Sequence, residues 1–171
     1  SNRTRVPETI DTQGDAMMKK GDNMMDGSTS SPPEDKTMED KGAMMEYSGK
    51  VLAGSEVKLL DFVKDDYDAA LKTDKLVVLY FYANWCPICK AEIPKLYSAF
   101  DELKSSQVIG FRVNYKDSDT DKNEEALARE FGVGYQHTKV FIKNGERVLK
   151  APDSWEKSRY LTEINKFIPT N

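Results

Sequence analysis

The 171-residue chain contains only two cysteines, Cys86 and Cys89, which are separated by Pro87 and Ile88. Two thiols at this spacing can form and break a disulfide, bind a soft metal ion, or hold a turn together. Disulfide exchange proceeds through a thiolate that attacks a sulfur atom. The chemistry of the pair therefore depends on the elements that position it and on the side chains around it.

The cysteine pair lies at an expected junction between a strand and a helix. Residues 76–82 are almost continuously apolar, which is typical of a strand buried on both faces. A helix is expected from Cys86 to about Lys104, and Pro87 suits its first turn because proline has no N–H to leave unpaired. The free N–H groups and the dipole of a helix N-terminus favour a thiolate. We expect Cys86 to be the exposed nucleophile and Cys89 the more buried resolving thiol.

The other expected elements alternate along the chain as in an α/β domain. Further strands are expected at residues 57–62, 108–114, 138–142 and 147–149, and further helices at residues 65–72, at residues 123–131, and from a Ser154 cap to about Phe167. This order predicts a central mixed sheet of four to five strands with helices on both faces. In open sheets of this kind, active groups lie beyond the carboxyl ends of the strands, where the chain order puts Cys86.

Residues 1–46 differ in composition from the rest of the chain. They contain no aromatic residue and are rich in Asp, Lys, Ser, Thr, Gly and Pro, so we expect a flexible, low-complexity leader before a domain at residues 47–171. All seven methionines lie in this leader, six of them as adjacent pairs. Thioethers can bind Cu(I) or consume oxidant, but a tail without specific chemistry is the favoured interpretation.

Charge and hydropathy narrow the possible functions. The net charge of −4 comes from the excess of acidic residues in the leader, and no basic stripe suggests binding to nucleic acid. No window contains the roughly 20 apolar residues of a membrane-spanning helix. The chain begins at Ser1, so a removed N-terminal segment would make the leader a possible tether to a membrane, with an ordinary flexible terminus as the alternative.

Residues from about 50 to 168 resemble the thioredoxin-like family. The matching features are the sequence from Trp85 to Lys90 after an apolar strand, Pro94, the element at residues 131–133, and the hairpin at residues 141–145. The resemblance implies a thioredoxin-like fold and a thiol–disulfide oxidoreductase whose redox centre is the Cys86–Cys89 pair, without another cofactor. It also implies protein thiols and disulfides as substrates and a redox-recycling partner, and we expect a monomer.

The stretch from Leu79 to Cys86 is similar to bacterial thioredoxin-domain proteins that are exported across the membrane. This narrower resemblance implies an extracytoplasmic location, either in the periplasm or anchored outside the cytoplasm.

Three positions depart from the family pattern. The cis-proline of the family aligns with His137, the buried Asp of thioredoxin aligns with Tyr80, and Pro87-Ile88 replaces Gly-Pro. We expect a trans peptide before His137, because a cis bond at a residue other than proline costs about 2.5–4 kcal/mol. Because Ile88 adds neither charge nor a hydrogen bond to hold a thiolate, we expect a reduction potential between the strongly reducing and strongly oxidising extremes.

The resemblance also suggests roles for neighbouring residues. Trp85 is expected to shield the cysteines and to offer an apolar docking surface, with core packing as the alternative. Glu92 could accept the Cys89 proton in place of the missing Asp, but a position on the helix surface is favoured, as it is for Lys90. His137 could act as a general acid or base near the sulfurs, or pair with the Cys86 thiolate.

Two other functions remain open at this point. One is a metallochaperone with a thioredoxin fold in which Cys86, Cys89 and His137 hold copper or zinc. The other is an adaptor whose disulfide is only structural, although such a short loop would stabilise the fold little.

Overall fold

The structure, a computed structural model, describes residues 46–169. These residues form β1 (Val51–Ala53), β2 (Leu59–Asp61), α1 (Lys64–Leu71), β3 (Leu76–Tyr82), α2 (Pro87–Glu102), β4 (Val108–Asn114), α3 (Lys122–Glu130), β5 (Thr138–Lys143), β6 (Glu146–Ala151) and α4 (Lys157–Asn165). No helix in this range is long and apolar enough to cross a membrane. The predictions for the leader and its methionine pairs concern residues outside the described range, apart from Glu46.

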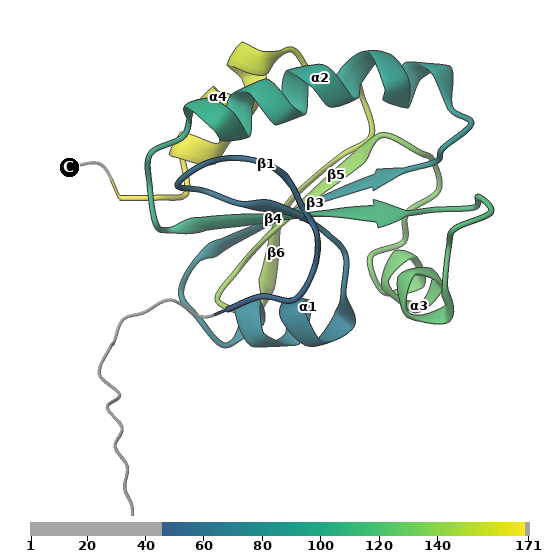
Figure 1. The fold of residues 1–171 in the computed structure, drawn as a ribbon, viewed down its shortest axis with the longest axis horizontal. Coiled ribbons are helices and arrows are strands. Elements are labelled where there is room, and N and C mark those ends of the chain that lie inside the picture. Colours follow the sequence, from purple (N-terminus) through teal and green to yellow (C-terminus); the bar gives the residue numbers. More distant parts are fainter. Residues whose placement is uncertain (1–45, 170–171) are drawn as a thin grey trace, which may run out of the picture. The chain divides into compact units, whose positions relative to one another are not determined.

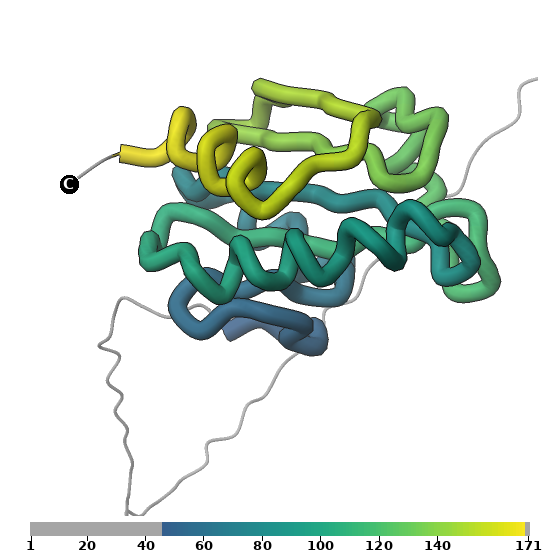
Figure 2. The backbone as a smooth tube through the Cα atoms, turned by 90° about the horizontal axis from the view of Figure 1, so that it is seen from above, coloured from purple at the N-terminus to yellow at the C-terminus, as the bar shows by residue number. Residues whose placement is uncertain are grey.

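The strands form one mixed sheet in the order β1-β2-β4-β3-β5-β6. Strand β3 lies at its centre, parallel to β4 on one side and antiparallel to β5 on the other. Helices α2 and α4 cover one face of the sheet and α1 and α3 cover the opposite face (Figure 1). Figure 2, which looks down on this face, shows α2 and α4 side by side in front of the strands. The predicted α/β fold, with a mixed sheet and helices on both faces, is confirmed.

Two details of the predicted fold are wrong. The sheet has six strands in the described residues, because the three-residue edge strand β1 pairs with β2 over a run too short to give a periodic pattern. Helix α4 begins at Lys157 after Glu156, not after a Ser154 cap. The intervening Trp155 is buried in the core, and its backbone N–H donates to Glu92. The chain therefore packs against the core at Trp155 before the helix begins.

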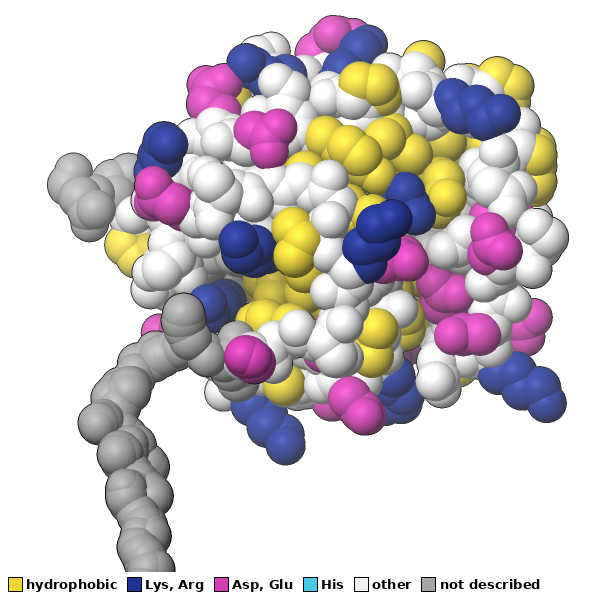
Figure 3. All heavy atoms as spheres, in the orientation of Figure 1, with side chains coloured by type: hydrophobic (Ala, Val, Ile, Leu, Met, Phe, Trp, Pro, Cys, Tyr) yellow, Lys and Arg dark blue, Asp and Glu magenta, His cyan; other side chains and the backbone are white. Residues whose placement is uncertain are grey.

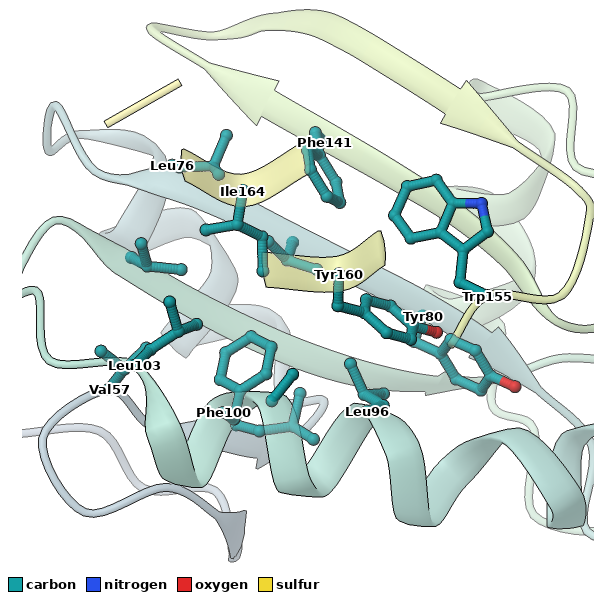
Figure 4. Packing of buried hydrophobic residues seen from close by; sticks show 14 of the residues in the cluster. Val57, Leu76, Tyr80, Leu96, Phe100, Leu103, Phe141, Trp155, Tyr160 and Ile164 are labelled. Carbon is teal, nitrogen blue, oxygen red and sulfur yellow. The ribbon is translucent and has the colours of Figure 1, made fainter. Parts of the chain in front are cut away.

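The core lies on both faces of β3, whose side chains alternate between them. Leu76, Val78 and Tyr80 pack with α2 and α4, while the residues between them face α1 and α3. Figure 4 shows the first of these clusters, with Trp155 and Tyr160 at the same end as Tyr80. Burial on both faces explains why this strand has no polar alternation. Because the cysteines belong to the first turn of α2, the sheet face that carries Leu76, Val78 and Tyr80 is the one beneath them.

Local sequence signals at two turns are confirmed. Asn144 and Gly145 both have positive φ, 52° and 81°, as the tight hairpin between β5 and β6 requires. Helix α3 begins with a reciprocal capping box between Asp121 and Glu124, and it ends before Gly132, whose φ is 61°.

Close packing of α2 on β4 predicts that Gly110 does not tolerate a side chain. A Cβ atom there would lie 2.5 Å from the Phe100 ring and 2.8 Å from the Leu59 side chain. We expect Gly110→Ala to lower the free energy of unfolding by about 1–3 kcal/mol, as measured by urea denaturation. The matched control is Gly134→Ala, where a Cβ meets nothing within 4 Å. Equal stability of the two variants would contradict this packing.

Candidate redox site

The two cysteines are positioned by the first turn of α2. Cys86 is the N-cap of the helix, and its Sγ accepts a hydrogen bond from the Cys89 N–H at 3.1 Å. Pro87 occupies the first helical position, as predicted. Both cysteines are free thiols in the structure. A sulfur that caps a helix N-terminus receives both a hydrogen bond and the favourable end of the helix dipole, so negative charge on Cys86 is stabilised there.

Cys86 is less accessible than the sequence suggested. Cys86 is only 4% exposed, so the prediction of an exposed nucleophile is wrong, although Cys89 is still the more buried of the two at 0%. The exposed residues beside them are Trp85 and Ile88, at 55% and 51%. The apolar side chains of this turn therefore face solvent while the thiols lie against the domain.

Trp85 is held by the loop that follows β4. Its indole N–H donates to the carbonyl of Lys116 at 2.9 Å, and the preceding Asn84 N–H donates to Asp117 at 2.8 Å. Asp117 also accepts a bond from Asn114 at the end of β4. Figure 3 shows acidic side chains gathered at the end of the molecule where β4 leads into α3. Trp85 is therefore an anchored surface residue, which excludes core packing as its role.

His137 lies directly before β5 in a left-handed backbone conformation, with φ of 55°. Its N–H donates to Phe81 at 2.6 Å, and its carbonyl accepts from Lys139 at 2.8 Å. The described residues contain no cis peptide bond, so the expected trans peptide before His137 is confirmed. The imidazole Nδ1 is buried and makes no hydrogen bond within residues 46–169.

The copper alternative gains no support from this geometry. Within residues 46–169, no group of three His, Cys, Asp or Glu side chains is placed to hold a metal ion. Cys86, Cys89 and His137 belong to this range, so their arrangement does not form such a group.

Cys89 is held in its protonated form by its surroundings. Burial raises its pKa to about 12, and its interaction with Cys86 contributes in the same direction. The neighbouring Tyr80 hydroxyl acts in the opposite direction. At neutral pH Cys89 is therefore a protonated thiol.

An ion pair beneath the cysteines was not anticipated from the sequence. Glu92 on α2 and Lys139 on β5 are 2% and 0% exposed, and their charged atoms lie 2.8 Å apart. The prediction that Glu92 lies on the helix surface is therefore wrong, whereas Lys90 is exposed as expected. The sequence did contain a signal for this burial, because Glu92 lies on the same helical stripe as the buried residues Leu96, Ala99 and Phe100.

Comparison with known proteins identifies the family. The thioredoxin family model matches residues 58–169, which is more than half of the chain. The chain belongs to the thioredoxin family. The match includes both cysteines, the buried ion pair and His137.

Individual relatives agree with this assignment. Thioredoxin-T of Drosophila melanogaster is 43% identical over 84 residues, which cover 48% of this chain and 49% of that protein. The protein disulfide-isomerase of Aspergillus oryzae is 32% identical over 115 residues, which cover 63% of this chain and 21% of that protein. This chain thus spans less than two thirds of the length of either relative.

Solved structures show the same thioredoxin fold. The thioredoxin of Schistosoma mansoni superposes with a TM-score of 0.51 and 27% identity, covering 67% of this chain and 100% of that one. The thioredoxin of Aeropyrum pernix gives a TM-score of 0.54 at 18% identity, covering 72% of this chain and 97% of that one. The narrower resemblance to exported bacterial proteins stays a prediction.

Asp117, in the loop that supports Trp85, should make the stability of the fold depend on pH. Burial alone would raise the pKa of Asp117, but hydrogen bonds from Asn114, Asn84 and Thr120 lower it below its usual range. A carboxyl with a lowered pKa in the folded state adds stability above its unfolded pKa of about 3.9, and this stability is lost as the pH falls through the lower folded value.

We therefore expect Asp117→Asn to lower the free energy of unfolding by about 1–3 kcal/mol at pH 7, because backbone and side-chain donors lose their charged acceptor. The difference from the native chain should shrink below about pH 4. Urea denaturation at both pH values measures this. The control is Asp119→Asn, which affects a more exposed carboxylate of the same loop. A deficit for Asp117→Asn that persists unchanged in acid would contradict the assignment.

Proposed function

We propose that this chain is a thiol–disulfide oxidoreductase that exchanges disulfides with protein substrates through Cys86 and Cys89. The observation that carries the proposal is the position of the Cys86 sulfur, which caps α2 and accepts the Cys89 N–H at 3.1 Å. A metal-binding or structural pair has no need for this arrangement, whereas a nucleophilic thiolate is stabilised by it. Thioredoxins and protein disulfide-isomerases among the relatives support the same class of reaction.

The exchange takes place in two steps, written here for a substrate disulfide that is reduced. The Cys86 thiolate attacks one substrate sulfur, the substrate S–S bond breaks, and the other substrate sulfur leaves as a thiolate. Cys89 then loses its proton and attacks Cys86, which releases the second substrate thiolate and forms the Cys86–Cys89 disulfide. Two electrons pass from the cysteine pair to the substrate, and the same steps in reverse oxidise a substrate dithiol.

Exposed apolar residues support a protein as the substrate. Trp85 and Ile88 flank Cys86, and Tyr135 lies two residues before His137 with 67% exposure. Exposed aromatic side chains on a rigid support are common anchors for partner proteins. The short β4–α3 loop supplies that support by bonding the Trp85 indole.

The redox group, the recycling partner, the oligomeric state and the location belong to the same proposal. We infer that the cysteine pair is the only redox group, that a separate redox partner recycles it, and that the chain acts as a monomer. An extracytoplasmic location, with the leader as a tether, is proposed from the motif around Cys86 and the composition of residues 1–46.

Reduction of insulin by a thiol donor tests the reaction directly. We expect the native chain to accelerate it and Cys86→Ser to lose the acceleration, because the attacking sulfur is gone. Cys89→Ser should trap a covalent mixed disulfide, since no thiol remains to resolve it, and denaturing gels without reductant would detect this adduct. Equal insulin reduction by the native chain and by correctly folded Cys86→Ser would contradict the proposed function.

The docking role of Trp85 has a separate test. We expect Trp85→Ala to raise the KM for a protein disulfide about tenfold, by the loss of an aromatic anchor, while reaction with a small aromatic disulfide changes little. The matched control is Val148→Ala, which removes an exposed apolar side chain from edge strand β6. Equal loss with protein and small disulfides would show that Trp85 affects the sulfurs themselves rather than docking.

A further inference from the structure

One buried carboxylate joins the two ends of the β4–α3 loop, residues 115–121. Glu124 Oε2 accepts the N–H of Asn114, the last residue of β4, at 2.7 Å. Its Oε1 accepts the N–H of Asp121, the N-cap of α3, at 3.0 Å. Glu124 is only 4% exposed. A single buried side chain therefore holds the end of the strand to the start of the helix.

The same loop supports the exposed side of the redox site. Its Lys116 carbonyl accepts the Trp85 indole N–H, and its Asp117 carboxylate accepts the Asn84 N–H. The loop lies at the end of the sheet where β3 leads into α2 (Figure 1). A displacement of the loop would therefore move the support of Trp85.

A hollow of about 680 Å³ lies between the loop and α3. Glu124 joins the two elements that line this hollow, so its hydrogen bonds help to set the distance between them. The loop contributes Tyr115, Lys116 and Thr120 to the lining, and α3 contributes Glu125, Ala128 and Arg129.

No cation balances the charge of Glu124. Within residues 46–169 it forms no ion pair. The charged groups that act on it most strongly are two acids, Asp121 and Asp61. A buried carboxylate without a counter-ion is costly when it is ionised, because the interior solvates the charge poorly. The two N–H groups offset only part of this cost.

The surroundings favour the protonated carboxyl while the loop is closed, that is, while both hydrogen bonds to Glu124 are made. Burial raises the pKa of Glu124 from 4.5 to about 7; the two acids act in the same direction and the two N–H bonds act against them. When the loop opens and water reaches the carboxyl, its pKa returns toward the ordinary value. The closed loop is therefore most stable below about pH 4.5, and this stability is lost as the pH rises to about 7.

We propose that Glu124 makes the β4–α3 loop a proton-sensitive hinge, which is closed while the carboxyl carries a proton and opens more often when it is ionised. A neutral carboxyl still accepts hydrogen bonds, so it keeps the loop closed without the cost of a buried charge. An ionised carboxyl gains hydration when the hinge opens. The hinge needs no redox reaction, and only its effect on docking through Trp85 rests on the proposed function.

Several elements bring other titratable or charged groups near Glu124. Asp117 in the loop titrates below the range of the hinge, because hydrogen bonds lower its pKa. Lys64 and Asp68 of α1, which packs beside α3, pair with each other at 2.7 Å. The remaining groups are Asp121, Lys122, Glu125 and Glu130 of α3 and its cap, Asp61 on β2 with Arg112 on β4, and Tyr82 at the end of β3.

Hydrogen exchange followed by NMR measures the opening of the hinge. The reporters are the Asn114 and Asp121 N–H groups and the Trp85 indole N–H, with each rate divided by the intrinsic exchange rate at that pH. We expect their protection to fall roughly 10- to 100-fold between about pH 5 and pH 8, as the different pKa values of the closed and open states require. They should also exchange faster than the Leu79 N–H in central strand β3, because the hinge opens without unfolding the domain.

Two variants assign the effect to one carboxyl. Glu124→Gln cannot ionise, so the pH dependence of the protection should disappear. The matched control is Glu125→Gln, which changes the adjacent exposed carboxylate and should keep the full pH dependence. Because Glu124→Gln also weakens the capping box of α3, its fold is checked by circular dichroism. The ¹³C shift of the Glu124 carboxyl in the native chain gives the same titration without a substitution.

The effect on docking is measured with two substrates. We expect the KM for a protein disulfide, divided by the KM for a small aromatic disulfide, to rise between about pH 6 and pH 8 as Trp85 loses its fixed support. The ratio cancels the titration of the cysteines, which affects both substrates. Glu124→Gln should give a constant ratio, and a constant ratio in the native chain would overturn the role of the hinge in docking.

The other outcomes separate the hinge from the exchange reaction. The hinge would be overturned by protection that stays within twofold from pH 5 to pH 8, by a Glu124 carboxyl that titrates near 4.5, or by a pH dependence that survives in folded Glu124→Gln. Reporter groups that exchange no faster than Leu79 would also overturn it, because the opening would then be global unfolding. None of these results depends on disulfide exchange, whose failure would be seen in the insulin assay.

Discussion

The ion pair between Glu92 and Lys139 is the interaction on which the arrangement around the cysteines depends. It joins α2 to β5, and through the Trp155 N–H and the Tyr160 hydroxyl it also joins the entry to α4. A buried pair is costly unless hydrogen bonds satisfy its other donors and acceptors. Here three elements converge to supply most of these bonds, although Glu92 Oε1 accepts none within residues 46–169. The same lysine fixes the His137 carbonyl, so one cation holds both the helix and the loop that border the sulfurs.

This arrangement gives the two cysteines different environments. Cys86 lies at the helix N-terminus, where its sulfur accepts a hydrogen bond, whereas Cys89 lies in the interior and keeps its proton. Solvent meets mainly Trp85 and Ile88, which are apolar and exposed. In the proposed exchange, attack by Cys86 and resolution by Cys89 therefore take place in different surroundings within one helical turn.

The sequence predicted the elements whose signals are local and continuous. Strands β3 and β4 have the predicted bounds, because β3 is a nearly continuous apolar run and β4 is mostly apolar and β-branched or aromatic. The Asn144-Gly145 turn was recognised by its residue types. Glu92 and Lys139 were missed as a pair because they lie 47 residues apart, and a single charge on a helix or strand is usually solvated. Their burial depends on tertiary packing, so only the stripe shared by Glu92 and Leu96 pointed to it.

The reduction potential of the Cys86–Cys89 couple tests the central claim that this pair is a redox centre for exchange. Equilibration of the full chain with thiol–disulfide buffers, followed by the fluorescence of the neighbouring Trp85, gives this value. The proposed function predicts a reversible two-electron transition between about −270 and −120 mV, the range from strongly reducing to strongly oxidising thiol–disulfide oxidoreductases. A potential below about −300 mV, typical of structural disulfides, would contradict the claim.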